Sequence, residues 1–237
     1  AVAVVVVLAI LSGEDPGAPV GEPLLPDLWS SDPFELTTEI VDGRPTVRFT
    51  SEINNQGAGD LIVRGNPESN DFAQWIPHSE SGHTLEAIEV VAVWAGDTHD
   101  HWHLDDIAQY RIEPLDGQFD GKSYDNKVGF CMFDSVNRHE GLPGAPDRVR
   151  YEIDGCGGRL VNEIAMGLSV GWGDQYRFNL YGQWIFIDDL PTGDYRLLAE
   201  VDPDGLLVES DRTNNRGWTD FRLEIMESGD RVVTELR

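Results

Sequence analysis

The sequence predicts an all-β, β-sandwich-like single domain with long loops and little helix. With 237 residues, of which 40% are hydrophobic, the chain can bury one sizeable core and stays within the length range of single all-β domains. Its strand-like runs are short and are separated by segments rich in Gly, Pro, Asn and Asp. Many short strands with regular turn signals are typical of a sandwich or a barrel.

The expected strands follow one another along the chain. Residues 45–54 alternate between polar and apolar, 60–65 form a short apolar run, and 84–96 are β-branched; 127–133 and 183–190 are similar. The turn segments between these runs read NNQGAGD, RGNPESND, EGLPGAPD and DLPTGDY. No helix of ordinary length is evident, although RLVNEIAMGL could form a short one.

The composition is strongly acidic. The formal net charge is −26, from 43 acidic and 17 basic side chains. We expect no nucleic-acid partner, because affinity for a phosphate backbone comes from Lys and Arg. Only two of the basic residues are lysines, Lys122 and Lys127. An acidic, lysine-poor surface is typical of a folded halophilic protein, since high salt screens its self-repulsion.

The N-terminus predicts export. Ala1–Leu11 is uninterrupted apolar sequence, too short to span a bilayer by itself, and the absence of an initiator Met suggests that upstream residues are missing. We interpret residues 1–20 as the remnant of a signal peptide or membrane anchor with a linker, and 21–237 as the globular domain. The protein is then secreted or extracellular, with or without an N-terminal membrane anchor. The alternative is that the apolar run is a buried strand.

The chain has two cysteines, Cys131 and Cys156. In an exported protein a disulfide between them is the favoured interpretation, and two buried free thiols are the alternative.

Three histidines occupy alternate positions in THDHWH: His99, His101 and His103. On a strand, residues two apart lie on one face about 6.6 Å from each other, and imidazoles can converge on one ion at about 2 Å. Half of the six histidines fall within these five residues, which favours metal binding over a merely polar, exposed face. Three imidazoles suit Zn, Cu, Ni or Fe, and spacing does not choose among them.

Several motifs in order resemble the lysyl oxidase family of copper amine oxidases, in a prokaryotic-type, salt-adapted form. They are NNQGAGDLIVRG, HDHWHLDD, DNKVGFCMFD, MGLSVGWGDQYRFNLYGQWIFIDDLPTGDY and VDPDGLLVESDRTNN, and they cover roughly residues 26–224. The resemblance implies that His99, His101 and His103 bind copper. It also implies a lysine tyrosylquinone cofactor, built from Lys127 in NKVGFC and Tyr176 in GLSVGWGDQY. Lys122 is close enough in sequence to be a rival.

Two aspartates are candidates for the catalytic base that such chemistry needs. Asp174 lies two residues before Tyr176, so both side chains face the same way on a strand. Asp105, two residues after His103, is the second choice and could instead orient a ligand imidazole. In so acidic a chain, either aspartate could also be ordinary solvated surface.

A second metal is implied by ESDRTNN, which offers the hard oxygen ligands that calcium prefers. The family resemblance implies a calcium site formed by this loop and the stretch PDL, with ligands from Asp27, the Leu28 carbonyl, Glu209, Asp211, Asn214 and Asn215. A turn held by Asx hydrogen bonds is the alternative.

The function implied by the resemblance is copper-dependent oxidative deamination of primary amines. The substrates would be lysyl side chains or small amines together with molecular oxygen, and the products an aldehyde, ammonia and hydrogen peroxide. Two alternatives remain: a non-catalytic, metal-binding β-sandwich adhesion module, and a metal-dependent hydrolase that would survive loss of Lys127. Lys127 and Tyr176 distinguish the amine oxidase from both alternatives, because only the amine oxidase needs both residues.

Overall fold

The computed structural model describes residues 18–96, 100–117, 124–139 and 141–236. The expected apolar N-terminal run therefore lies outside the described residues. The all-β prediction is confirmed, because the strands form three sheets in which every pairing is antiparallel. In the described part of the chain the only helical element is one short 3₁₀ turn, η1 (Ile153–Cys156).

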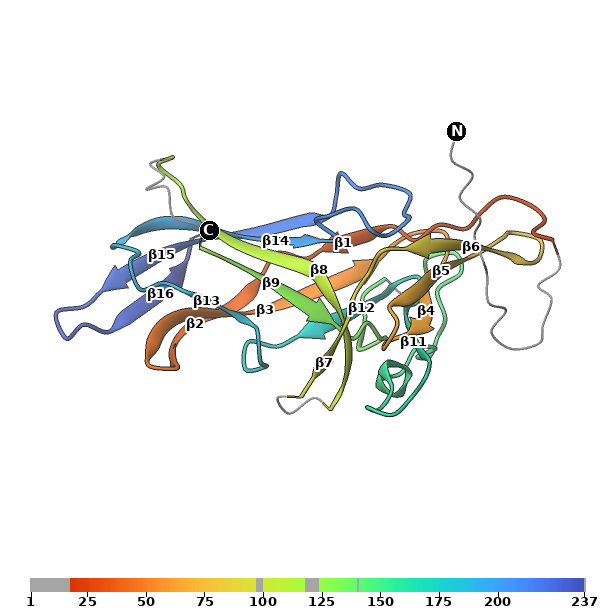
Figure 1. Ribbon diagram of the computed structural model, residues 1–237. Coiled ribbons are helices and arrows are strands. Elements are labelled where there is room, and N and C mark those ends of the chain that lie inside the picture. Colours follow the sequence, from red (N-terminus) through yellow and green to blue (C-terminus); the bar gives the residue numbers. More distant parts are fainter. Residues whose placement is uncertain (1–17, 97–99, 118–123, 140, 237) are drawn as a thin grey trace, which may run out of the picture.

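Two six-stranded sheets and one four-stranded sheet make up the fold (Figure 1). The first sheet has the order β1-β3-β12-β10, and β2 and β13 also pair with β3. Its strands are β1 (Leu28–Ser30), β2 (Phe34–Val41), β3 (Arg44–Asn55), β10 (Val136–Asn137), β12 (Trp172–Tyr176) and β13 (Trp184–Phe186).

The second sheet has the order β16-β15-β14-β8-β7, and β9 pairs with β8. Its strands are β7 (Ala92–Ala95), β8 (His101–Pro114), β9 (Asp125–Phe130), β14 (Gly193–Val201), β15 (Arg216–Ile225) and β16 (Arg231–Glu235). The four-stranded sheet, at the right of Figure 1, comprises β11 (Ile164–Leu168), β4 (Leu61–Asn66), β5 (Asp71–Pro77) and β6 (His83–Ile88).

The core lies between the two six-stranded sheets. The ring centroids of Phe49 on β3 and Tyr110 on β8 are 4.7 Å apart in an edge-on arrangement. The ring centroids of Phe130 on β9 and Tyr176 on β12 are 4.0 Å apart. Strand β3 is buried over almost its whole length, as expected for a strand covered on both faces. These contacts join the two sheets into one sandwich, because each sheet supplies aromatic side chains that pack against those of the other.

A β-bulge interrupts the pairing of β8 with β9. The pairing passes from Leu104 opposite Phe130 to Ala108 opposite Val128, and Asp106 adopts a positive φ of 55°. A step of four residues along β8 thus matches a step of two along β9, and the two extra residues leave the alternation of faces beyond the bulge unchanged. His103, before the bulge, and Tyr110, after it, are both buried.

Several expected element boundaries were wrong. The run at 84–96 is not one strand, because β6 ends at Ile88 and β7 begins at Ala92. The segment 159–168 is not a helix, since its last residues pair as β11 with β4 in the four-stranded sheet. The runs at 127–133 and 183–190 contain shorter strands than expected, which end at Phe130 and Phe186.

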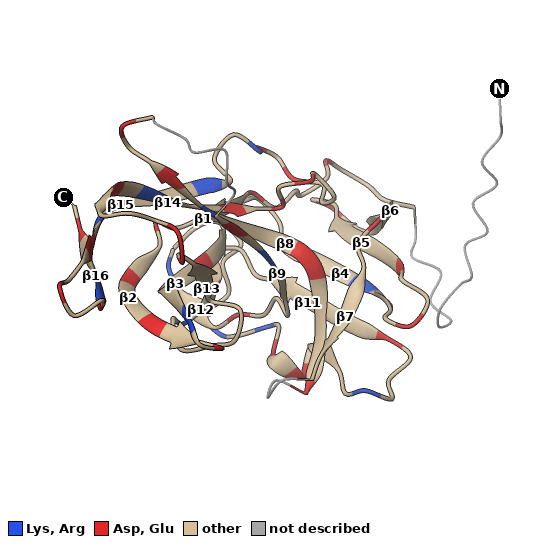
Figure 2. Ribbon diagram, turned by 60° about the vertical axis from the view of Figure 1, so that its left-hand side comes forward, with Lys and Arg blue, Asp and Glu red and all other residues tan. Residues whose placement is uncertain are grey.

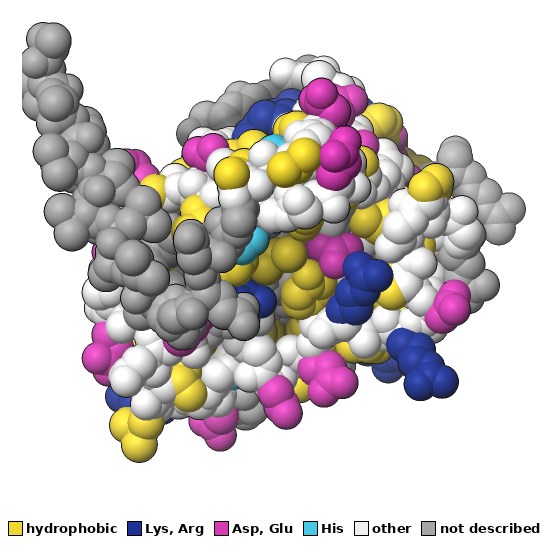
Figure 3. Space-filling view, turned by 90° about the vertical axis from the view of Figure 1, so that its right-hand side faces the viewer, with side chains coloured by type: hydrophobic (Ala, Val, Ile, Leu, Met, Phe, Trp, Pro, Cys, Tyr) yellow, Lys and Arg dark blue, Asp and Glu magenta, His cyan; other side chains and the backbone are white. Residues whose placement is uncertain are grey.

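Acidic side chains are distributed over many strands and loops rather than gathered in one patch (Figure 2). The face seen in Figure 3 is hollowed, with hydrophobic side chains on its floor and charged side chains around it. Within the described ranges, no helix has the length and apolar character to cross a bilayer.

Candidate functional site

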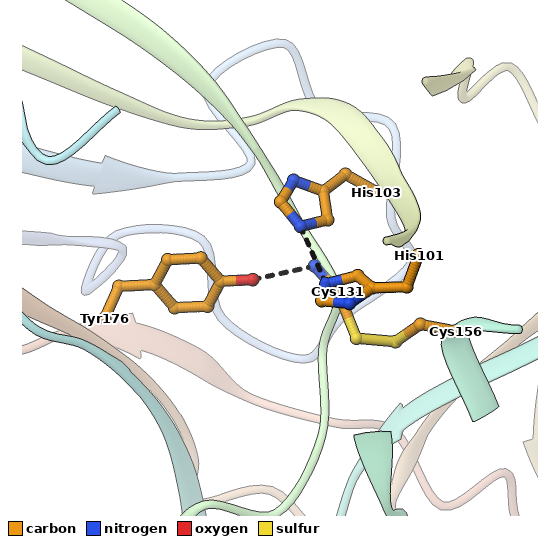
Figure 4. Close-up of a disulfide and its surroundings, with 5 residues drawn as sticks. All are labelled: His101, His103, Cys131, Cys156 and Tyr176. Atoms are coloured by element: carbon orange, nitrogen blue, oxygen red, sulfur yellow. Dashed lines mark hydrogen bonds between the residues drawn. A yellow bond between two sulfur atoms is a disulfide. The ribbon is translucent and has the colours of Figure 1, made fainter. Parts of the chain in front are cut away.

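His101 and His103 converge at the start of β8. Their Nε2 atoms are 3.0 Å apart, and Figure 4 shows the two rings pointing toward each other. His99, the third expected ligand, lies outside the described residues. Strand β8 begins at His101, and Asp100 has a positive φ of 50°, so the expected strand alternation holds for His101 and His103 but does not extend back through Asp100.

The histidine pair fits a metal ion. Two nitrogens 3.0 Å apart can both bind one ion at about 2 Å, on adjacent coordination positions such as copper(II) offers. His103 is only 8% exposed, so a metal held there would be partly shielded from solvent. Gly129 on β9 makes this packing possible, because a Cβ on it would lie 3.0 Å from both the His103 Cβ and the Leu104 carbonyl oxygen.

Tyr176 lies beside this pair in the core. Its ring centroid is 6.2 Å from that of His103, and its hydroxyl oxygen accepts a hydrogen bond of 3.0 Å from the backbone N–H of Cys131 (Figure 4). Burial raises the pKa of Tyr176 well above its ordinary value, the nearby Asp174 raises it further, and the Cys131 amide opposes both. These effects favour the neutral form of the phenol, and the hydrogen bond from Cys131 fixes its orientation.

The predicted disulfide between Cys131 and Cys156 is confirmed. Both cysteines are fully buried, and Cys156 ends η1. Because Cys131 also donates its amide to Tyr176, the disulfide ties η1 to the residue that orients the phenol.

Asp174 is buried with only partial compensation for its charge. The side chain is fully inaccessible, and neither carboxylate oxygen makes a well-formed hydrogen bond. Burial raises the pKa of Asp174 well above its ordinary value; Asp134 and Glu52 raise it further, and the nearby Ser135 hydroxyl and Phe133 amide only partly offset this.

Asp105 does not share this environment. It is partly exposed and lies in the bulged segment of β8, where its carboxylate raises the pKa of Lys127. Asp174, two residues from Tyr176 on β12, therefore has the environment of a candidate base, whereas Asp105 contributes to the charge around the lysine.

A second buried tyrosine, which sequence reasoning did not single out, lies in the same core. The hydroxyl of Tyr110 is 2.6 Å from the Ser51 Oγ, which in turn donates to the Gln183 Oε1 at 3.0 Å. Burial raises the pKa of Tyr110 far above its ordinary value, and the charge of Asp174 raises it further. Tyr110 is buried in ordinary strand alternation with Ala108 and Ile112, so no sequence signal distinguishes it from other core residues.

Lys127 is not in contact with Tyr176. Its Nζ is 2.8 Å from the Asp204 Oδ2 and 3.8 Å from the Asp106 Oδ2, and its side chain is 33% exposed. The hydrogen bond to Asp204 raises the pKa of Lys127, and the charges of Asp106, Asp204 and Asp105 add to this effect. The rival residue, Lys122, lies outside the described residues.

The expected calcium ligands gather around the start of β1. Asn214 Nδ2 donates to Asp27 Oδ1 at 2.8 Å, Asn215 Nδ2 donates to Glu209 Oε1 at 2.8 Å, and the Leu28 amide donates to Glu209 Oε2 at 3.0 Å. The side-chain oxygens of Asn214 and Asn215 are buried without a hydrogen-bond partner.

The two unpaired amide oxygens fit a bound cation, because calcium takes its ligands from amide and carboxylate oxygens. Burial raises the pKa of Glu209, so its carboxylate also lacks full compensation. Asp211 differs, since it is exposed and its Oδ1 accepts hydrogen bonds from the Thr213 amide and hydroxyl; these bonds lower the pKa of Asp211. At Asp211 the local turn that was the alternative interpretation is present.

The fold and the site together define a class: an all-β protein with a pair of converging histidines beside a buried tyrosine. Comparison with known proteins specifies the family. The family model for lysyl oxidase matches residues 30–229, and the chain therefore belongs to the lysyl oxidase family.

Among curated relatives, the chain is 31% identical over 175 residues to lysyl oxidase homolog 3A of Danio rerio, which covers 73% of this chain and 18% of the relative. It is 28% identical over 182 residues to lysyl oxidase homolog 2 of Gallus gallus, covering 76% of this chain and 19% of that protein. Protein-lysine 6-oxidase of Gallus gallus is 27% identical over 195 residues, covering 81% of this chain and 37% of the relative. The matched region thus spans well under half of the length of each of these relatives.

Proposed function

We propose that this protein is a copper amine oxidase that deaminates primary amines, either lysyl side chains or small amines. Molecular oxygen is the oxidant, and the products are an aldehyde, ammonia and hydrogen peroxide. The observation that carries the proposal is the placement of Tyr176, whose ring lies 6.2 Å from His103, beside two imidazole nitrogens that are 3.0 Å apart. Family membership supports the same reaction.

His101 and His103, with His99, would hold the copper. Copper with oxygen supplies the oxidation of the tyrosine ring, and the oxidised ring joined to Lys127 supplies an electrophilic carbonyl for the substrate amine. The chain's own contribution begins with orientation, because the Cys131 amide fixes the Tyr176 hydroxyl at 3.0 Å. Burial of the ring also keeps bulk water away from the reacting atoms.

Asp174 is our candidate for the catalytic base. A base must compete for a proton of the substrate carbon, and burial strengthens Asp174 as a proton acceptor by raising its pKa. Neither carboxylate oxygen makes a well-formed hydrogen bond, so the carboxylate can accept this proton. Tyr110 is buried in the same core with its hydroxyl beside the Ser51 Oγ, so it provides a matched control.

A calcium ion at Asp27, Leu28, Glu209, Asn214 and Asn215, with Asp211 at the rim, is the second part of the proposal. The unpaired oxygens of Asn214 and Asn215 carry it. Such an ion would join the loop after β14 to the start of β1 and so would be structural rather than catalytic.

We also infer that residues 21–237 form the catalytic domain of an exported, salt-adapted protein. The buried disulfide supports an oxidising compartment, and the net charge of −26 supports a high-salt environment. An N-terminal anchor or signal in residues 1–20 belongs to the same proposal.

The test of the amine oxidase proposal is a phenylhydrazine titration of protein matured aerobically with copper in high salt. A coloured adduct is expected in the parent and in Tyr110→Phe, and none in Tyr176→Phe or Lys127→Ala. Hydrogen peroxide release with small amines and with lysyl peptides then identifies the substrate class. An absent adduct in folded, copper-loaded parent would refute the proposal.

A further inference from the structure

Lys127 is held by carboxylates on the side of β9 away from Tyr176. Asp204 Oδ2 accepts a hydrogen bond of 2.8 Å from the Lys127 Nζ, and Asp106 Oδ2 lies at 3.8 Å. Asp204 comes from the loop after β14, and Asp106 from the bulge of β8. Two separate elements therefore place negative charge on one ammonium group.

The geometry of β9 separates Lys127 from the tyrosine. Phe130 packs against Tyr176, and Asn126 donates to the Gly182 and Trp184 carbonyls of the facing segment. Residues 126 and 130 share one face of the strand, and residue 127 lies on the other face. Lys127 is three residues from Phe130, about 10 Å along the strand, so it must leave its present position before it can meet Tyr176.

The loop that carries Asp204 is itself anchored. The Asp202 amide donates to the Ile107 carbonyl at 2.7 Å, and the Arg212 guanidinium donates to the Asp202 carbonyl at 3.0 Å. The Asp202 carboxylate accepts from the Leu206 and Leu207 amides. Asp204 is therefore presented to Lys127 by an ordered turn rather than by a chance surface contact.

We propose that Asp204, assisted by Asp106, is a positioning residue that holds Lys127 on the outer face of β9 and sets how readily it leaves to join Tyr176. This inference rests on the proposed function, because the joining of Lys127 and Tyr176 is part of that proposal. We call Asp204 and Asp106 the carboxylate clamp.

The clamp opposes the joining reaction in two ways. It keeps the amine away from the ring, and it favours the ammonium form, which has no lone pair with which to form the bond to carbon. Oxygen is the oxidant of the whole conversion. One O₂ gives one atom to the ring, where a C–O bond replaces a C–H bond, and its other atom becomes water. The N–C bond to Lys127 then replaces a second ring C–H bond, and a second O₂ takes up the two electrons and two protons released and becomes hydrogen peroxide. The charged groups around Lys127 are Asp204, Asp106 and Asp105, and all three favour its protonated form.

The first test measures the clamp in metal-free protein, where no cofactor can form. Acetic anhydride at pH 8 and low salt labels the two lysines, and peptide mass spectrometry gives the rate at Lys127. Asp204→Asn is expected to raise this rate about two- to fivefold, the range for an exposed ion pair. Asp204→Glu should stay close to the parent, and so should Asp194→Asn, which removes a carboxylate from a separate surface pair with Arg222. Salt should raise the parent rate, and it should raise the Asp204→Asn rate less, because only the charges of Asp106 and Asp105 are left to screen.

The second test follows the Lys127–Tyr176 cross-linked peptide by mass spectrometry after addition of copper and oxygen. In Asp204→Asn the cross-link should form faster and at lower pH than in the parent, and Asp204→Glu should restore the parent behaviour. Equal labelling of Lys127 in parent and Asp204→Asn would overturn the clamp. Faster labelling with an unchanged cross-linking rate would overturn its control of the joining step. No cross-link in any variant, with labelling still faster in Asp204→Asn, would refute the proposed function instead.

Discussion

Removal of the buried disulfide should destabilise this protein by an amount that follows from its loop. Cys131 and Cys156 are separated by 25 positions. In the chain-entropy treatment, a closed loop of this size lowers the entropy of the unfolded chain enough to contribute about 3.5 kcal/mol at 25 °C. In Cys131→Ala/Cys156→Ala the free energy of unfolding should fall by this amount, and the small cavities left by two buried sulfurs should add to the loss.

Urea unfolding of metal-free protein, monitored by Trp fluorescence in high salt, measures this change. Reductant should bring the parent close to the double variant and leave the double variant unchanged. Because the Cys131 amide orients the Tyr176 hydroxyl, the double variant should also form the phenylhydrazine adduct more slowly at a temperature where it is fully folded. A loss of less than about 1 kcal/mol, or a parent insensitive to reductant, would refute the loop-entropy reasoning.

Three further predictions concern single positions. The raised pKa of Asp174 means that its folded form holds a proton more tightly than the unfolded chain. Asp174 should therefore lower the free energy of unfolding of metal-free parent by about 1.4 kcal/mol per pH unit as the pH rises above about 4, until its folded pKa is reached. Asp174→Asn should lack this contribution when urea unfolding is measured across the same pH range. Gly129→Ala should lower the free energy of unfolding by about 1–3 kcal/mol, as measured by denaturation. It should also weaken copper binding by displacing His103, and an unchanged affinity in a copper titration would contradict this role. Calcium added to chelated parent should raise the melting temperature, and Glu209→Gln should reduce that increase; no calcium response in calorimetry would exclude the site.

The main strands were predictable because their side-chain patterns are local. The run at 45–54 became β3 and the run at 60–65 became β4, each within a residue or so of the expected limits. The expected helix at 159–168 failed for a physical reason. Its apolar residues suit a helix and a strand equally, and Ile164–Leu168 gain a ladder of hydrogen bonds from β4 that only the folded sheet can offer.

The site was predictable where function depends on spacing along one strand. His101 and His103 converge as their alternation predicted, and the two cysteines pair. The surroundings of these residues were not predictable in the same way. Tyr110 was missed because it is buried in ordinary alternation with Ala108 and Ile112, and its place near the candidate site depends on how the two sheets pack.

The sequence by itself indicated the fold class and the lysyl oxidase family, and it singled out the histidines that we propose as metal ligands, because each depends on residue type and short-range spacing. Only the tertiary structure decided that Tyr176 lies in the core next to His103, that Asp174 is buried with only partial compensation, and that Lys127 is bound to Asp204 on another face. Those relations join residues from different sheets and loops, so they depend on how the sheets and loops pack, which local sequence does not encode.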